Sequence, residues 1–205
     1  MEPLSKLFGT PARVKLLRLF LFNPEGVYGR DDVVERARVT PAMASKELAA
    51  LARMGLIKRR TFYKESARTS GTAAQKRKTL GWMLDSKYVY REALGTFLHD
   101  TLALRDSDVR KRFMSIGPVR VCILSGFLVA GDTESELDVL LVGNALESDM
   151  VDTVMRGLEA ECGREIRYAV IPVEEYLYRL RVRDKMLRNI LDYPHTVLVD
   201  KIGSL

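Results

Sequence analysis

Cysteine and histidine are scarce in this chain of 205 residues, which contains two of each. Cys122 and Cys162 are 40 positions apart and His99 and His195 lie near neither, so the ligand spacing of a structural zinc site is missing. The start of the chain also lacks the charged, apolar and small-residue pattern of a secretory signal. These absences predict two reduced thiols and a cytoplasmic location.

Long hydrophobic runs are absent too. The longest, such as Leu19–Phe22 and Val121–Ala130, fall far short of the roughly 20 residues that cross a bilayer as a helix. No membrane segment is therefore expected. Apolar residues still make up 47% of the chain, which is enough to bury one medium-sized core or two small ones.

Charge is distributed unevenly along the chain. Residues 1–118 contain 23 Lys and Arg against 12 Asp and Glu, a net charge of +11, whereas residues 119–205 contain 10 against 15, a net charge of −5. A basic half can approach a polyanion through contacts that release condensed counterions, and an acidic half is repelled by it. The asymmetry indicates two parts with different roles.

Three helices and a basic hairpin are predicted in the first part. A Thr-Pro pair marks the start of two of the helices, since Thr10 and Thr40 can act as N-caps with Pro at the first helical position. Gly55 ends the third helix. Alternating apolar and basic residues then predict two strands separated by a polar stretch, Glu65–Lys78. The predicted elements are helices Pro11–Phe22, Asp31–Ala37 and Pro41–Met54 and strands Leu56–Tyr63 and Thr79–Leu84.

This order of elements resembles winged helix-turn-helix regulators of bacteria and archaea. In the third helix, Ala44, Leu48 and Leu51 fall on one side, and short or donor side chains fall on the other. The resemblance implies that this outer side enters the major groove of double-stranded DNA and that the hairpin contacts phosphates or a minor groove. The alternative is that the charges form a solvated face. The predicted DNA-binding residues are Thr40, Ala42, Ser45, Lys46, Arg53, Lys58, Arg59, Arg60, Lys64, Arg68, Lys76, Arg77 and Lys78.

Two amphipathic helices, Tyr88–Leu104 and Asp106–Ile116, are predicted to link the parts. The first places Tyr90, Leu94 and Phe97 on one apolar side, which either forms a homodimer interface or packs on the first helix of the chain. The second part then alternates between strands and helices, which indicates an α/β (α+β) sheet domain. We therefore expect a winged helix-turn-helix domain at 1–86, linking and dimerisation helices at 87–117, and a mixed-sheet domain at 118–205.

The stretch 124–142, LSGFLVAGDTESELDVLLV, resembles the signature of minimal nucleotidyltransferases of the polymerase-β superfamily. That signature is a Gly-Ser turn followed by an Asp-x-Asp motif that opens a strand. Two carboxylates at i and i+2 share one face of a strand and can hold Mg²⁺, while a glycine turn lets the backbone approach a nucleotide. The resemblance implies metal ligands at Glu136 and Asp138 and nucleotide contacts at Ser125, Gly126 and Arg167.

The chain departs from this signature at three places. Leu124 stands where the family has glycine, Glu136 replaces the first Asp, and Glu165, the candidate third carboxylate, shares its predicted strand face with Arg167, which would compete with a cation. A solvated loop is the alternative interpretation of the two acids. The sequence thus predicts a DNA-binding transcriptional regulator whose inactive nucleotidyltransferase-like domain senses a ligand, binds a protein partner or dimerises. The alternatives are an antitoxin-type enzyme that transfers a nucleotide to a protein, and an interaction scaffold that binds no DNA.

Overall fold

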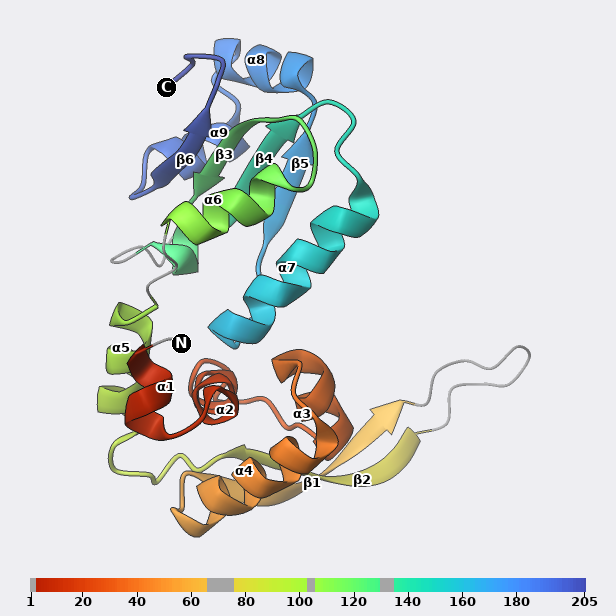
Figure 1. The fold of residues 1–205 in the computed structure, drawn as a ribbon, viewed down its shortest axis with the longest axis vertical. Helices are drawn as coiled ribbons and strands as arrows, with labels where there is room; N and C mark the ends of the chain where they lie inside the picture. Colours follow the sequence, from red (N-terminus) through yellow and green to blue (C-terminus); the bar gives the residue numbers. More distant parts are fainter. Residues whose placement is uncertain (1–2, 66–75, 103–105, 130–134) are drawn as a thin grey trace, which may run out of the picture. The chain divides into compact units, whose positions relative to one another are not determined.

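The computed structural model describes residues 3–65, 76–102, 106–129 and 135–205 and confirms an α+β protein with two sheets (Figure 1). The chain divides into two compact units. The first comprises residues 1–98 together with 159–164, and the second comprises residues 99–158 and 165–205. None of the described helices is long and apolar enough to cross a membrane.

The first unit follows the predicted order of three helices and a hairpin, flanked by a helix at each end. The two Thr-Pro starts are confirmed, since Thr10 Oγ1 accepts the N–H of Arg13 at 3.0 Å and Thr40 Oγ1 accepts that of Met43 at 3.3 Å. The elements are α1 (Pro3–Phe8), α2 (Pro11–Leu21), α3 (Arg30–Ala37), α4 (Pro41–Arg53), β1 (Ile57–Glu65), β2 (Lys76–Leu84) and α5 (Arg91–Asp100).

The core of the first unit lies between α2, α3, α4 and the start of the hairpin. Phe20 of α2, Val33 of α3 and Leu48 of α4 are almost completely buried there, together with Ile57 at the start of β1. Ala44, Leu48 and Leu51 are all buried, so the predicted inner side of α4 is confirmed. Burial of these side chains fixes the orientation of α4 and leaves its opposite side to solvent.

The hairpin is antiparallel along its full length, from the Ile57–Leu84 pair to the Glu65–Lys76 pair. Tyr28 extends it, because its N–H and C=O both bond to the backbone of Trp82 at 2.9 Å. Gly81 lies beside this bridge, where a β-carbon would stand 2.7 Å from the Tyr28 carbonyl oxygen. The close approach explains the glycine in the middle of β2.

Helices α1 and α5 differ from the prediction. α1 was not expected from the sequence. α5 begins at Arg91 rather than Tyr88, since the N–H groups of Tyr88 and Arg91 bond to Asp85 O and Tyr88 O as successive turns. The rings of Phe8 and Phe97 contact each other with centroids 6.4 Å apart, whereas Tyr90 remains 63% exposed. The predicted apolar side of this helix is therefore only partly buried in the chain itself.

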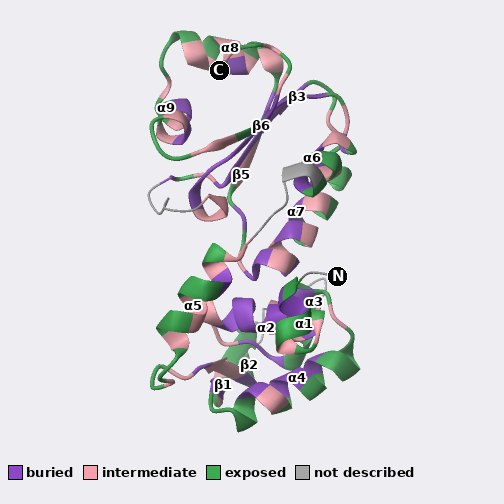
Figure 2. Ribbon diagram, turned by 60° about the vertical axis from the view of Figure 1, so that its left-hand side comes forward, coloured by how far each residue is buried: buried purple, intermediate pink, exposed green. Residues whose placement is uncertain are grey.

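The second unit is a four-stranded mixed sheet with helices on both faces (Figure 2). The strand order is β5-β4-β3-β6, with β4 and β5 parallel and the other pairs antiparallel. One face packs on α8 and α9, where Tyr176 and Ile190 are buried. The elements are α6 (Asp106–Met114), β3 (Val119–Leu124), η1 (Gly126–Leu128), β4 (Val139–Gly143), α7 (Ser148–Cys162), β5 (Tyr168–Ile171), α8 (Val173–Arg181), α9 (Lys185–Leu191) and β6 (Thr196–Asp200).

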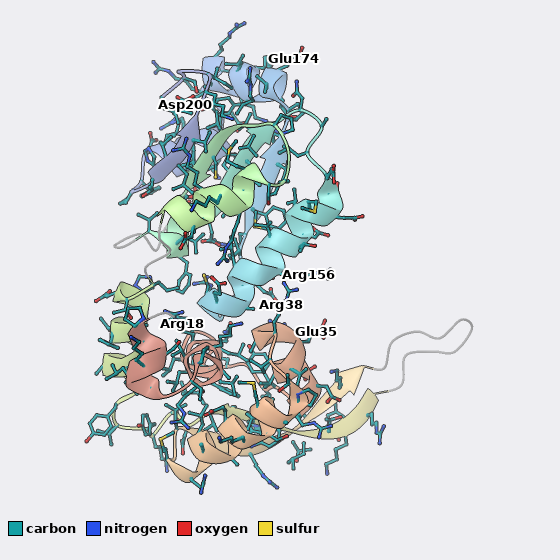
Figure 3. The ribbon with its side chains drawn as sticks, viewed as in Figure 1. Arg18, Glu35, Arg38, Arg156, Glu174 and Asp200 are labelled. Atoms are coloured by element: carbon teal, nitrogen blue, oxygen red, sulfur yellow. The ribbon has the colours of Figure 1, made fainter. Side chains whose placement is uncertain are left out.

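Asp200 at the end of β6 holds the residues that follow it (Figure 3). Its carboxylate accepts the backbone N–H groups of Ile202, Gly203, Ser204 and Leu205 at 2.8–3.1 Å. Desolvation opposes ionisation of this carboxyl, but the four hydrogen bonds outweigh it and lower its pKa from the ordinary value of 3.8. The ionised form of Asp200 therefore orders the turn after β6.

Candidate functional site

The outer side of α4 is the largest set of predicted site residues that the structure places on one surface. Ala42, Ser45, Lys46, Ala49 and Arg53 are all exposed, as the periodicity of the sequence predicts. Met43 is 40% exposed beside them, which the sequence analysis missed. This outer side of α4, with Thr40 at its amino end, is a helix surface that carries short, apolar and donor side chains.

A buried ion pair holds the inner side of α4 against α2. Glu47 has a side chain only 2% exposed, and its carboxylate accepts Arg13 Nε at 2.7 Å and Thr10 Oγ1 at 2.9 Å. Arg13 also donates from Nη1 to Phe8 O at 3.2 Å. Thr10 thus caps α2 and bonds to α4 at once. Because all of these atoms are bonded, the network defines where α4 stands in the unit.

Three basic side chains of the hairpin are engaged inside the first unit. Lys58 pairs with Asp85 at 3.0 Å, and the Arg59 guanidinium lies 5.9 Å from the centroid of the Trp82 ring. Lys64 forms an ion pair with Asp32 of α3, and this hydrogen bond raises the pKa of Lys64. These contacts hold the hairpin in place and reduce the charge that Lys58 and Lys64 present to solvent.

Three further hairpin cations are exposed and form no ion pair within the described ranges. Arg60, Arg77 and Lys78 have no carboxylate within ion-pair distance in the described part of the chain. Tyr63, directly across from Lys78, is 68% exposed. Of the other predicted hairpin residues, Arg68 and the side chain of Lys76 lie outside the described residues. The hairpin therefore combines three open positive charges with an exposed aromatic ring.

In the second unit, Asp138 and Arg167 form a closely bonded pair. The carboxylate of Asp138 is 1% exposed, and its Oδ1 accepts Phe127 N and Arg167 Nη2, each at 3.0 Å. Its Oδ2 accepts the backbone N–H and the Nε of Arg167, at 2.9 and 3.1 Å. Arg167 Nη2 also donates to Ser135 O at 2.8 Å. The negative charge of Asp138 is therefore paired with Arg167, and its carboxylate oxygens are fully hydrogen-bonded.

Ser125 and Gly126 form the turn that lies next to the Asp138–Arg167 pair. Ser125 is completely buried, and its hydroxyl donates to Leu137 O at 2.6 Å rather than to solvent. Gly126 has a φ of +56°, and a β-carbon there would collide with Asp138 Oδ1 and lie 3.3 Å from Arg167 Nη2. The glycine turn thus admits the carboxylate of Asp138, an intramolecular role that the sequence analysis had not anticipated.

Contrary to what the resemblance implies, Glu136 and Asp138 do not share one face of a strand, because β4 begins only at Val139. Glu136 is exposed, and its backbone N–H donates to Asn189 Oδ1 at 2.7 Å, whereas Asp138 is buried. In the described ranges, no three His, Cys, Asp or Glu side chains form a ligand set. A divalent cation needs several oxygen ligands with free lone pairs, and those of Asp138 are taken. The arrangement therefore does not fit the Mg²⁺ that the resemblance implies.

Comparison of the chain with protein-family models, with curated proteins and with solved structures finds no match.

Proposed function

We propose that the protein is a DNA-binding transcriptional regulator that inserts the outer side of α4 into the major groove and places the hairpin on the sugar-phosphate backbone. One observation carries the proposal. The side of α4 opposite the core is exposed over the whole helix, and in the same unit the hairpin presents Arg60, Arg77 and Lys78 unpaired by any described carboxylate. A helix of this kind fits the major groove, and such cations fit phosphates.

The distribution of ion pairs favours DNA over a merely solvated charged surface. Asp85 and Asp32 pair with Lys58 and Lys64 and hold the hairpin in place, but no carboxylate among the described residues pairs with Arg60 of β1 or Lys78 of β2. The net charge of +11 over residues 1–118 adds a long-range attraction for a polyanion. Short side chains at Ala42 and Ala49 let a backbone or base edge come close to α4.

We infer a ligand-sensing or partner-binding role for the second unit, without metal-dependent nucleotidyl transfer. Such transfer needs cations to offset the charge that develops on phosphate. Arg167 already takes up both oxygens of Asp138, and Glu136 is turned to solvent. The nucleotidyltransferase resemblance therefore supports at most a related sheet, with an internal ion pair where a metal site would stand.

The test is a titration of fluorescent duplex DNA over a series of salt concentrations. Arg60→Ala combined with Lys78→Ala should make the slope of log K against log salt shallower by about two units, because each phosphate contact releases close to one counterion. The matched control is Lys6→Ala combined with Lys87→Ala, which removes two exposed charges of the same unit outside α4 and the hairpin.

An equal change of slope in both double variants would show general electrostatic attraction rather than a hairpin contact. No binding of duplex DNA by the wild-type chain at low salt would overturn the proposal and leave the scaffold alternative.

A further inference from the structure

The hydrogen-bonding groups on the outer side of α4 are almost all donors. The exposed residues of this helix are Pro41, Ala42, Met43, Ser45, Lys46, Ala49, Ala52 and Arg53, and none of them is Asp, Glu, Asn or Gln. The one acid of α4, Glu47, is buried and bonded to Arg13 and Thr10. The hydroxyl of Ser45 is therefore the single exposed side-chain acceptor on α4.

The apolar groups on this surface lie next to the donors. Ala42, Lys46, Ala49 and Arg53 follow one another at spacings of four, three and four residues, which is a straight row along a helix. Met43, one position along the chain from Ala42, flanks this row with its thioether 40% exposed. Methyl groups and cationic donors thus alternate over about three turns.

Base edges in the major groove differ in the groups that they present. Guanine presents two acceptors, N7 and O6, and thymine presents the O4 acceptor with a methyl group. Cytosine presents an amino donor, and adenine presents an amino donor beside its N7 acceptor; proteins bind these amino groups with Asn, Gln, Asp or Glu. The outer side of α4 has partners for the first two bases and, apart from the Ser45 hydroxyl, none for the amino groups.

We propose that α4 recognises keto bases, with Lys46 on a guanine and Met43 and Ala42 on thymine methyl groups, and that Ser45 is the one position that accepts an adenine or a cytosine. This inference rests on the proposed DNA-binding function and specifies the sequence that the same surface selects. Arg53, at the far end of the row, would reach a phosphate or a second guanine.

The experiment begins with selection of the preferred duplex from a random pool by the full-length wild-type protein. The selected site is then resynthesised with deoxyuridine for each thymine in turn, which removes only the methyl group, and with 7-deazaguanine for each guanine, which removes the N7 acceptor. We expect a loss of about 4-fold in affinity for each contacted methyl group and of about 5-fold or more for the contacted guanine.

Variants assign the contacts. Met43→Ala should bind the thymine and uracil duplexes equally at the one thymine that Met43 contacts, and Lys46→Met should no longer distinguish guanine from 7-deazaguanine. Met54→Ala is the matched control, because Met54 is 51% exposed but lies past the end of α4. It should retain the full preference of the wild type. All three side chains are exposed, so the variants are expected to fold.

Two outcomes would overturn the inference, and they are distinguishable. A selected site that tolerates every uracil and 7-deazaguanine substitution would refute keto-base recognition while the DNA-binding function stands. Failure to enrich any duplex, together with no salt-dependent binding, would refute the proposed function itself and the inference with it.

Discussion

The ion pair between Arg13 and Glu47 allows a quantitative test of what holds α4 in place. Arg13→Met removes the guanidinium and keeps the apolar stem, which leaves a carboxylate that is 2% exposed without a cation. Removing one partner of a buried pair in this way costs about 3–5 kcal/mol of unfolding free energy. Glu47→Gln leaves Arg13, whose side chain is 30% exposed and can be hydrated, so a smaller loss of about 1.5–3 kcal/mol is expected.

The double variant Arg13→Met with Glu47→Leu separates loss of the pair from loss of a single partner. Since no charge then remains buried, it should be more stable than Arg13→Met alone. With the single variant Glu47→Leu measured as well, the cycle gives the coupling energy. Urea denaturation followed by the fluorescence of Trp82 is a suitable assay, because this only tryptophan of the chain lies on β2 of the first unit.

Lys46→Met is the control for these measurements. It changes a neighbouring exposed cation of α4 and should shift stability by no more than about 0.5 kcal/mol. If Arg13→Met were no more destabilising than this control, or if the double variant were as unstable as the sum of its parts, the buried network would not determine the position of α4.

Four further predictions concern the Asp138–Arg167 pair, nucleotide transfer, the turn after β6 and self-association. Arg167→Met leaves Asp138 buried without its cation and should destabilise the second unit by about 3–5 kcal/mol in thermal unfolding followed by circular dichroism. The wild type should transfer no labelled nucleotide to itself in the presence of Mg²⁺ or Mn²⁺. Nucleotide transfer that Asp138→Ala abolishes would contradict this expectation. The lowered pKa of Asp200 means that its ionised form stabilises the fold above the ordinary value of 3.8 and that this contribution is lost as the pH falls through the folded-state pKa. The difference in melting temperature between Asp200→Asn and the wild type should therefore disappear in strong acid, and a constant difference would contradict the assignment. Light scattering should show that the wild type is a dimer and that Phe97→Glu dissociates it. The control is Tyr178→Glu, which changes an exposed ring of the second unit and should leave the dimer intact. A wild-type monomer at tens of micromolar would exclude dimerisation through α5.

Local patterns in the sequence predict most of the elements. The Thr-Pro pairs at Thr10 and Thr40 identify two helix starts because capping depends only on neighbouring residues. The two sides of α4 follow from helical periodicity, and the alternation of apolar and basic residues identifies β1. These signals extend over one element at most.

Contacts between distant residues could not be predicted in this way. Glu47 is polar, so the sequence gives no sign that it is buried until Arg13 and Thr10, more than 30 positions away, are brought to it. The sequence predicts that Arg167 competes with a cation near Glu165, but its three hydrogen bonds to Asp138 depend on the turn at Gly126. Both cases are charges whose partners are defined by tertiary structure.

The division of α4 into two sides bears on how such a protein could evolve. Its attachment to the first unit depends on Ala44, Glu47, Leu48 and Leu51, whereas the proposed DNA contacts come from residues that touch little else. Substitutions on the outer side should then alter stability only by their helix propensity, up to about 0.7 kcal/mol each. A lineage, or a designed library, could explore new target sequences at these positions while every member keeps its fold.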